Sequence, residues 1–388
     1  MKKTTKLKLA YYIFKIFSDF IFIYPYYALM MREQGITDSG YSTLMIIWVL
    51  PIFIFEVPSG IIADKYNRKA VIVVGQLIRS FGYLTWVLKP DFIGFAIGFI
   101  CWGLASTLRS GALEALIYDN LLAINQEDQF SKIESKSIFF KTISIAIVTL
   151  LSSYLIDYGF ELLIYLSLIS LLICILAILT IKDHRLEDEC SVKNKSFIAI
   201  FKEGSRDLFQ DKALVFLTVL GVVFMISGML DEYWGLLLED LGYSYSVIGK
   251  IILIIMIVES STMLLIPKFE NNKNFSFFIL IGGLLLLSTA FNGIIVIVCF
   301  IIFNSFFKLY ENVISIRFQK TIDSGARATV TSFKGVLEEL LCIGYYGLIG
   351  GVTNYFDLTS TMVIMGGLLV IMAFVIYVNK SKSKYLFK

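Results

Sequence analysis

The segment Gly60-Ile61-Ile62-Ala63-Asp64-Lys65-Tyr66-Asn67-Arg68-Lys69 joins two long apolar stretches and ends in a charged turn. The stretch before it covers about residues 41–62, and the stretch after it covers about 70–88. Both are long enough to cross a bilayer, because a spanning helix needs about 20 mostly apolar residues. The short charged turn between them predicts a helical hairpin that crosses a membrane twice.

The composition of the whole chain supports a membrane location for this hairpin. Of the 388 residues, 57% are hydrophobic and only 17% are charged, with a mean hydropathy of +0.78. Soluble proteins contain about 25% charged residues. The chain also begins with lysines that lead directly into an apolar run of full membrane length. We therefore expect this run to be the first spanning helix and not a cleaved signal peptide.

Further apolar runs predict about twelve spanning segments. All of them should be helices, because lipid offers no hydrogen-bond partner to a free backbone group. The fold class is therefore an all-α polytopic membrane protein. The spans are predicted near residues 9–31, 41–62, 70–88, 91–118, 137–156, 160–181, 213–237, 245–266, 276–292, 294–316, 328–352 and 359–379.

Charged residues between the spans predict the orientation and the division of the chain. Basic residues gather in alternate loops and at both ends, whereas the opposite loops are mostly acidic. The positive-inside rule then places both termini in the cytoplasm. The longest polar stretch divides the chain into a six-helix bundle at 1–182, a linker at 183–212 and a second six-helix bundle at 213–388. Within the linker, 197–209 predicts an amphipathic helix on the inner membrane surface.

The charged turn carries a recognisable motif. Gly60 is followed four residues later by Asp64, and the turn ends in the basic residues Lys65, Arg68 and Lys69. This pattern resembles the signature of the major facilitator superfamily (MFS), in the loop where that family carries it. The resemblance implies a gate in which Arg68 pairs with carboxylates, and Asp119 is the expected second partner. Asn67 stands where the family usually has glycine, and we expect it to adopt a left-handed turn.

Three shorter patches resemble a Firmicute-type subset of that family, which includes multidrug and small-molecule efflux proteins. They are Glu56 to Gly60, Ser110 to Asp119 and Arg327 to Ser332. The resemblance implies export. The fifth span departs from many proton-coupled drug exporters, because residues 141–158 contain no proline or glycine. That motif therefore does not support drug–proton antiport.

Several charged residues lie inside the predicted spans, where charge is costly and usually functional. Three pairs, Lys15 and Asp19, Lys308 and Glu311, and Lys334 and Glu338, are spaced to pair on one helix, which is their structural alternative. Glu259 and Glu339 have no basic residue at such a spacing, and Glu56 could instead brace the gate. Arg79 and Arg109 fit either a carboxylate partner or an anionic substrate. The candidates for proton coupling or for lining a cavity are Asp19, Glu56, Arg79, Arg109, Glu114, Glu259 and Glu339.

Aromatic and small residues add two further expectations. Trp102 and Trp234 are candidates for the aromatic wall of a substrate cavity, with lipid-facing positions as the alternative. The pairs Gly94 and Gly98, and Gly347 and Gly351, form GxxxG patterns that predict close helix packing.

The chain lacks the residues of common catalytic and metal sites. Its five cysteines are scattered without paired spacing, and His184 is the only histidine. The sequence also has no phosphate-binding loop of the Walker type. We therefore expect no enzyme activity, no catalytic residue, no metal and no cofactor. Nucleic acid is not an expected partner, because the basic residues are spread over many loops.

These observations leave three functional hypotheses. The first is a secondary transporter that exports small amphipathic molecules by proton antiport with alternating access. The second is a proton- or ion-coupled uptake permease for a small organic solute, with Arg79 and Arg109 favouring an anionic one. The third is a non-transporting membrane sensor or scaffold. We expect a monomer in the bacterial cytoplasmic membrane, with membrane lipids, protons and a small-molecule substrate as its partners.

Overall fold

The computed structural model describes residues 2–182, 197–291, 293–322 and 327–379. Within these ranges, the side chains of some helical residues are not described, at 2–4, 56, 57, 60, 61, 63–65, 197–201, 327–329, 332 and 379. The chain divides into two compact units. The first contains Met1–Asn194 and Ser244–Lys250, and the second contains Lys195–Tyr243 and Ile251–Lys388.

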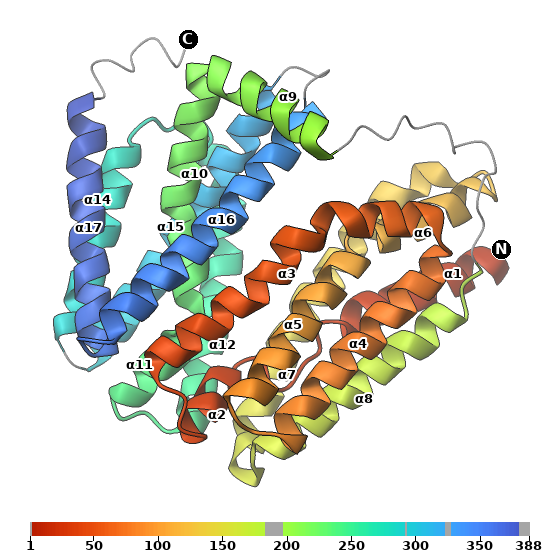
Figure 1. Cartoon of the computed structure of the whole chain (residues 1–388), viewed down its shortest axis with the longest axis horizontal. Coiled ribbons are helices and arrows are strands. Elements are labelled where there is room, and N and C mark those ends of the chain that lie inside the picture. Colours follow the sequence, from red (N-terminus) through yellow and green to blue (C-terminus); the bar gives the residue numbers. More distant parts are fainter. Residues whose placement is uncertain (1, 183–196, 292, 323–326, 380–388) are drawn as a thin grey trace. The chain divides into compact units, whose positions relative to one another are not determined.

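From residue 2 to residue 182, the first unit is described as eight α-helices and two short 3₁₀ turns (Figure 1). Helix α5 packs against both α3 and α4, and α8 packs against α1 and α4. The helices are α1 (Lys2–Phe17), α2 (Tyr27–Glu33), α3 (Asp38–Lys65), α4 (Arg68–Leu88), α5 (Phe92–Arg109), α6 (Ala112–Leu122), α7 (Phe130–Leu155) and α8 (Phe160–Leu179), with 3₁₀ turns at Glu127–Gln129 and Ile156–Tyr158.

The second unit is also helical throughout its described residues. Helices α14 and α17 lie side by side, and α10 packs against α15 (Figure 1). The helices are α9 (Phe197–Gln210), α10 (Lys212–Asp231), α11 (Trp234–Asp240), α12 (Tyr245–Thr262), α13 (Ile266–Phe269), α14 (Phe275–Leu287), α15 (Ile294–Thr321), α16 (Arg327–Thr353) and α17 (Leu358–Asn379), with 3₁₀ turns at Met263–Leu265 and Ser288–Ala290. Most of α12 is assigned to this unit, and its first residues to the other.

Ten helical segments within the described residues are long and apolar enough to cross a membrane. They confirm the all-helical membrane architecture and ten of the predicted spans. The span predicted at 276–292 is a shorter apolar helix, Phe275–Ala290. The span predicted at 9–31 is not one helix, because α1 ends at Phe17 and α2 begins at Tyr27. The count of twelve and the cytoplasmic position of both termini therefore stay predictions.

Two other predicted spans are also interrupted. The span at 91–118 bends between α5 and α6, where Gly111 has a φ of +71°, in the left-handed region that favours glycine. The span at 213–237 breaks between Asp231, the last residue of α10, and Trp234, the first residue of α11. At each interruption, backbone groups lose their helical hydrogen bonds, and nearby side chains lie inside the bundle.

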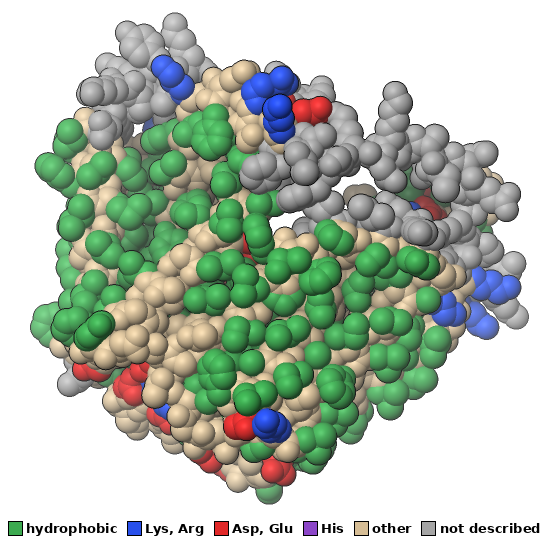
Figure 2. Space-filling view, in the orientation of Figure 1, with side chains coloured by type: hydrophobic (Ala, Val, Ile, Leu, Met, Phe, Trp, Pro, Cys, Tyr) green, Lys and Arg blue, Asp and Glu red, His purple; other side chains and the backbone are tan. Residues whose placement is uncertain are grey.

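Large apolar side chains remain exposed along the spanning helices. Leu77 and Phe81 of α4 and Ile93 of α5 are each more than half exposed. Figure 2 shows apolar side chains across the visible face of these helices, with charged side chains near the helix ends. Such a surface suits lipid, which solvates apolar side chains that water would not. Buried apolar residues of α1, α6 and α8 form a separate core inside the first unit.

Candidate functional site

The first spanning segment is interrupted where Ser18 and Asp19 follow the end of α1. This break leaves the Ser18 carbonyl without a helical partner. Arg79 on α4 supplies one, because its Nη1 donates to the Ser18 carbonyl oxygen at 2.9 Å. The second terminal nitrogen, Nη2, donates to the hydroxyls of Tyr24 and, at 3.5 Å, Tyr83. Arg79 is only 3% exposed, so it holds the break together from inside the unit.

Asp19 lies at the break and is surrounded mainly by positive charge. It is 8% exposed, and its Oδ2 accepts a hydrogen bond from the Ser18 hydroxyl at 2.9 Å. Lys141 on α7 forms an ion pair with the same oxygen at 3.2 Å. Arg109 at the end of α5 and Arg79 also interact electrostatically with Asp19. The structure therefore brings together three sequence candidates, Asp19, Arg79 and Arg109, and adds Lys141, which was not among the candidates named from the sequence.

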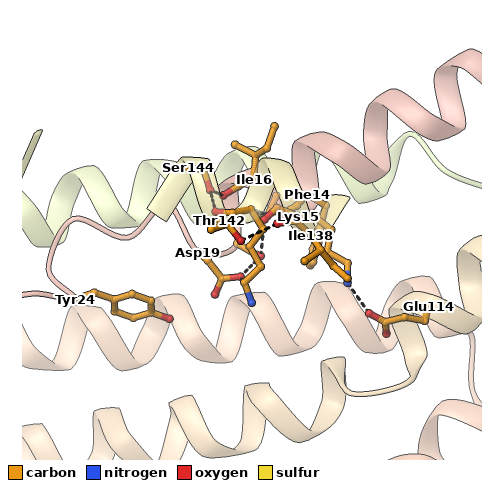
Figure 3. Close-up of polar contacts among 12 residues, drawn as sticks. Phe14, Lys15, Ile16, Asp19, Tyr24, Glu114, Ile138, Thr142 and Ser144 are labelled. Atoms are coloured by element: carbon orange, nitrogen blue, oxygen red, sulfur yellow. Dashed lines mark hydrogen bonds and ion pairs between the residues drawn. The ribbon is translucent and has the colours of Figure 1, made fainter. Parts of the chain in front are cut away.

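The expected pair between Lys15 and Asp19 is wrong. Because α1 ends at Phe17, the two side chains do not share a helix face. Lys15 instead pairs with Glu114 on α6 at 2.7 Å and with Glu134 on α7 at 3.2 Å, and Figure 3 shows Lys15 reaching Glu114. Tyr11 also donates its hydroxyl to Glu134. Glu134 was missed because the predicted span began at residue 137, whereas α7 begins at Phe130.

Aromatic rings line the same region. Trp102 on α5 stacks on Tyr24 with ring centroids 5.2 Å apart and an angle of 9° between the ring planes. The Arg79 guanidinium lies 5.6 Å from the centroid of Trp102 and 5.8 Å from that of Tyr24, which is within cation–π range. Figure 3 shows Tyr24 and Asp19 on the same side of this region. The site in the first unit thus combines an aromatic wall with a carboxylate and several cations.

The charged turn after α3 is partly described. The structure brings Arg68 and Asp119 together as an ion pair, while Lys69 donates to the Leu179 carbonyl oxygen at 2.6 Å. Asn67 does not adopt a left-handed turn. It has a φ of −57° and caps α4, since its side-chain oxygen accepts from the Ala70 amide. The side chains of Glu56, Gly60, Asp64 and Lys65 lie outside the described part of the structure, although their backbones belong to α3. The gating role of this turn stays a prediction.

The second unit has a polar cluster at its own helix break. Asp231 ends α10 and remains solvent-accessible. Its Oδ1 accepts hydrogen bonds from Trp234 Nε1 at 2.9 Å and from Asn304 Nδ2 on α15 at 2.6 Å. Trp234 is only 2% exposed and packs on Phe300, with ring centroids 4.2 Å apart, so its exposed area is too small for a cavity wall.

Carboxylates outnumber cations around Asp231. Lys308 pairs with Glu311 at 3.1 Å, which confirms the predicted spacing, and it also interacts electrostatically with Asp231 and Glu259. Asp231 and Asn304 were not among the candidates named from the sequence, because a single carboxylate or amide at a helix break forms no recognisable pattern. Among the described residues, no three His, Cys, Asp or Glu side chains are grouped to hold a metal ion.

The remaining candidate, Glu339, lies on α16 near a second predicted pair. Lys334 and Glu338 form the expected ion pair on the same helix. Glu339 is half-buried and interacts electrostatically with Cys342.

Comparison with solved structures gives transporters of one fold. A variant of the nucleoside transporter NupG matches with a TM-score of 0.79 at 14% identity, covering 98% of this chain and all of that one. A bacterial homologue of the iron transporter ferroportin matches with a TM-score of 0.72 at 13% identity, covering 97% of each chain. A D-xylose–proton symporter matches with a TM-score of 0.62 at 13% identity, covering 96% and 95%. At these identities the likeness shows the fold alone.

Sequence comparison identifies the family. A Bacillus subtilis (strain 168) protein described as the uncharacterized MFS-type transporter YxaM is 28% identical over 211 residues, which are 52% of this chain. The match spans only half the length of that relative. The family model of the Major Facilitator Superfamily matches residues 9–344, nearly the whole chain. The family match and the fold are both those of membrane transporters. The chain belongs to the Major Facilitator Superfamily.

Proposed function

We propose that this protein is a proton-coupled secondary transporter of small amphipathic organic molecules that works by alternating access. The observation that carries the proposal is the pair of interrupted spans, each with a carboxylate at its break. Asp19 follows α1 in the first unit, and Asp231 ends α10 in the second. Interrupted spanning helices commonly bind the substrate and the coupling ion in secondary transporters. The aromatic wall formed by Trp102 and Tyr24 suits an apolar part of the solute.

Export by proton antiport is the direction predicted from the sequence, and the second unit supports it. Asp231 is accessible, and the carboxylates Glu259 and Glu311 lie near the cation Lys308. A cationic amphipathic molecule would compete with a proton for such a group of carboxylates. Binding of that solute would then release a proton, which is the requirement for antiport.

Uptake of an anionic solute is the second candidate, and the first unit supports it. Asp19 is the carboxylate among Lys141, Arg109 and Arg79. An anion and the Asp19 carboxylate would compete for the same cations, so the anion binds better when Asp19 carries a proton. The proton and the anion would then move together. A non-transporting sensor, the third hypothesis, draws no support from the family match.

The direction of proton movement separates these candidates. We would add amphipathic cations and anions to the purified, weakly buffered protein and record the pH, with Asp19→Asn and Asp231→Asn in parallel. Proton release with cations that is lost in Asp231→Asn would support antiport. Proton uptake with anions that is lost in Asp19→Asn would support cotransport. If compounds that bind move no protons at all, proton coupling is wrong.

We further propose that the protein is a monomer in the bacterial cytoplasmic membrane, with both termini on the cytoplasmic side. The distribution of basic residues between loops supports this orientation. A membrane-impermeant maleimide applied to intact cells would test it. A cysteine introduced at Lys89, in the mostly acidic set of loops, should be labelled. A cysteine at Lys65, in the basic set, should be protected until the cells are opened.

A further inference from the structure

We infer that Arg109 and Lys141 form a subsite for the negatively charged group of the solute, with Asp19 as the resident counter-ion that the solute replaces. The inference rests on the proposed transport function and adds the chemical class of the substrate. That class is a small amphipathic organic anion with a planar apolar part, such as an aromatic carboxylate.

Charge balance is the first argument. Asp19 is buried, and the charged groups that act on it are Arg109, Lys141 and Arg79. Asp19 by itself cannot neutralise these three cations, and among the described residues no second carboxylate is paired with any of them. Positive charge in excess inside a membrane protein is unfavourable unless an anion or water compensates it. A solute that carries a negative charge therefore gains from the field that these side chains already create, and it gains most when Asp19 is protonated.

Accessibility decides which cations a solute can reach. Arg79 is 3% exposed and uses both terminal nitrogens at the break of the first span, so its role is to hold that break. Arg109 is only partly buried and has no hydrogen bond or ion pair with any residue that the structure describes. The Lys141 side chain is 40% exposed. Arg109 and Lys141 are thus the two cations available to an anion, and they come from different helices, α5 and α7.

The position of the aromatic wall indicates where the apolar part of the substrate binds. Trp102 and Arg109 are seven residues apart on α5. Seven residues make about two turns, so both side chains lie on nearly the same face, about 10 Å apart along the helix axis. Trp102 is only partly buried and is stacked on Tyr24. This spacing suits a solute about as long as a two-ring aromatic carboxylate.

The coupling between solute and proton follows from the shared cations. When Asp19 binds a proton, its carboxyl group loses its negative charge and its ion pair with Lys141. The anion then pairs with Lys141 in place of the Asp19 carboxylate. Anion binding should therefore draw a proton from solution at a pH where Asp19 is ionised. The other groups that face Asp19 or interact with it come from all the surrounding elements, and they are Ser18, Tyr24, Arg79, Tyr83 and Cys174.

The test uses three probes with the same ring and different charge. They are naphthalene-2-carboxylate, its neutral amide and the 2-naphthylmethylammonium cation, titrated calorimetrically into the purified full-length protein. We expect the carboxylate to bind at least tenfold more tightly than the other two. Arg109→Gln and Lys141→Gln should each weaken its binding about tenfold, which corresponds to about 1.4 kcal/mol. Asp19→Asn should strengthen carboxylate binding and abolish the accompanying proton uptake.

Matched controls keep the result interpretable. Lys136→Gln removes an exposed lysine from the same helix α7 and should leave binding unchanged. Thermal unfolding of each variant shows that it is folded. The inference is overturned if the carboxylate binds no better than the amide, or if Arg109→Gln and Lys141→Gln bind it like the wild type. If the cation is transported uphill while the carboxylate fails to bind, the subsite is wrong but the transport function stands. If the carboxylate binds as expected and no solute is transported, the transport function fails instead.

Discussion

The two units carry opposite charge at their interrupted helices. In the first unit, Asp19 lies among three cations, and the backbone is free of α-helix from Ser18 to Tyr26. In the second unit, one cation, Lys308, lies among Asp231, Glu259 and Glu311, and only Glu232 and Tyr233 separate the two helices. The repeated architecture therefore does not repeat the chemistry. The backbone groups that an interrupted span frees must find hydrogen-bond partners. The charge of the site is set separately, by the side chains that face the interruption.

Because of this difference in charge, we expect removal of Lys308 to destabilise the protein more than removal of any single cation around Asp19. Lys308→Met would remove the cation that acts on Asp231, Glu259 and Glu311, and we expect it to cost about 2 kcal/mol of stability, because these groups are only partly buried. Lys141→Met should cost less than about 1 kcal/mol, because Lys141 is 40% exposed and Asp19 keeps Arg109 and Arg79 nearby. Thermal unfolding in detergent measures both.

A second substitution checks that the loss at Lys308 is electrostatic. Glu311→Gln removes the carboxylate that pairs with Lys308 at 3.1 Å. Combined with Lys308→Met, it should restore part of the lost stability. Equal losses for Lys308→Met and Lys141→Met would show that the charge difference between the units has no energetic consequence.

Helix packing gives a second contrast between the units. A side chain added at Gly98 on α5 would collide with the Trp86 ring, which is 1% exposed and cannot move away. At Gly351 on α16, an added Cβ meets nothing within 4 Å. Gly98→Ala should therefore destabilise the protein by about 2 kcal/mol, while Gly351→Ala should leave the melting temperature unchanged or slightly raised. A neutral Gly98→Ala would mean that α4 and α5 pack less closely than described.

Arginines near helix ends use different partners in the two units. Arg68 in the first unit pairs with the Asp119 side chain, whereas Arg317 in the second donates to the backbone carbonyl oxygens of Glu270 and Asn272. We expect a coupling energy of about 1.5 kcal/mol between Arg68 and Asp119 in a double-mutant cycle of unfolding stability. Exchanging the two residues, Arg68→Asp with Asp119→Arg, should recover part of the loss. A coupling near zero would contradict the ion pair.

The smallest expected effect is at a helix cap in the second unit. The Ser360 amide donates to Asp357 at 2.6 Å, and this bond lowers the pKa of the Asp357 carboxyl below its usual value. A lowered pKa means that the ionised carboxylate stabilises the fold above its unfolded pKa, and that this contribution is lost as the pH falls through the folded pKa. Because Asp357 is exposed, Asp357→Asn should cost less than about 0.5 kcal/mol at pH 7.

The pH dependence identifies the source of that effect. Melting curves of the wild type and Asp357→Asn should converge in acid, where the wild-type carboxyl also becomes neutral. Asp91, which caps α5 in the first unit by accepting from the Gly94 amide at 2.9 Å, offers the matched comparison. A difference that persists unchanged in acid would assign the effect to packing and not to charge.

The sequence by itself determined the membrane class, the helical content, the family and most span positions. These follow from the length and hydrophobicity of apolar runs and from the motif around Arg68, and such properties are local. Same-helix pairs were also predictable, as Lys308 with Glu311 and Lys334 with Glu338 show. The spacing of residues along one helix fixes which side chains meet.

The tertiary structure alone decided the contents of the two sites. The contacts in these sites join residues that are 73 to 122 positions apart or that lie beyond a helix end. They are the contacts of Lys15 with Glu114 and Glu134, of Asp19 with Lys141, and of Asp231 with Asn304. The positions at which α1 and α10 stop also came from packing, because no proline or glycine marks Phe17 or Asp231. Hydropathy reports only that a segment is apolar enough for lipid. The partner that satisfies a freed carbonyl or a buried charge is set by the neighbouring helices, and that information is not local in the chain.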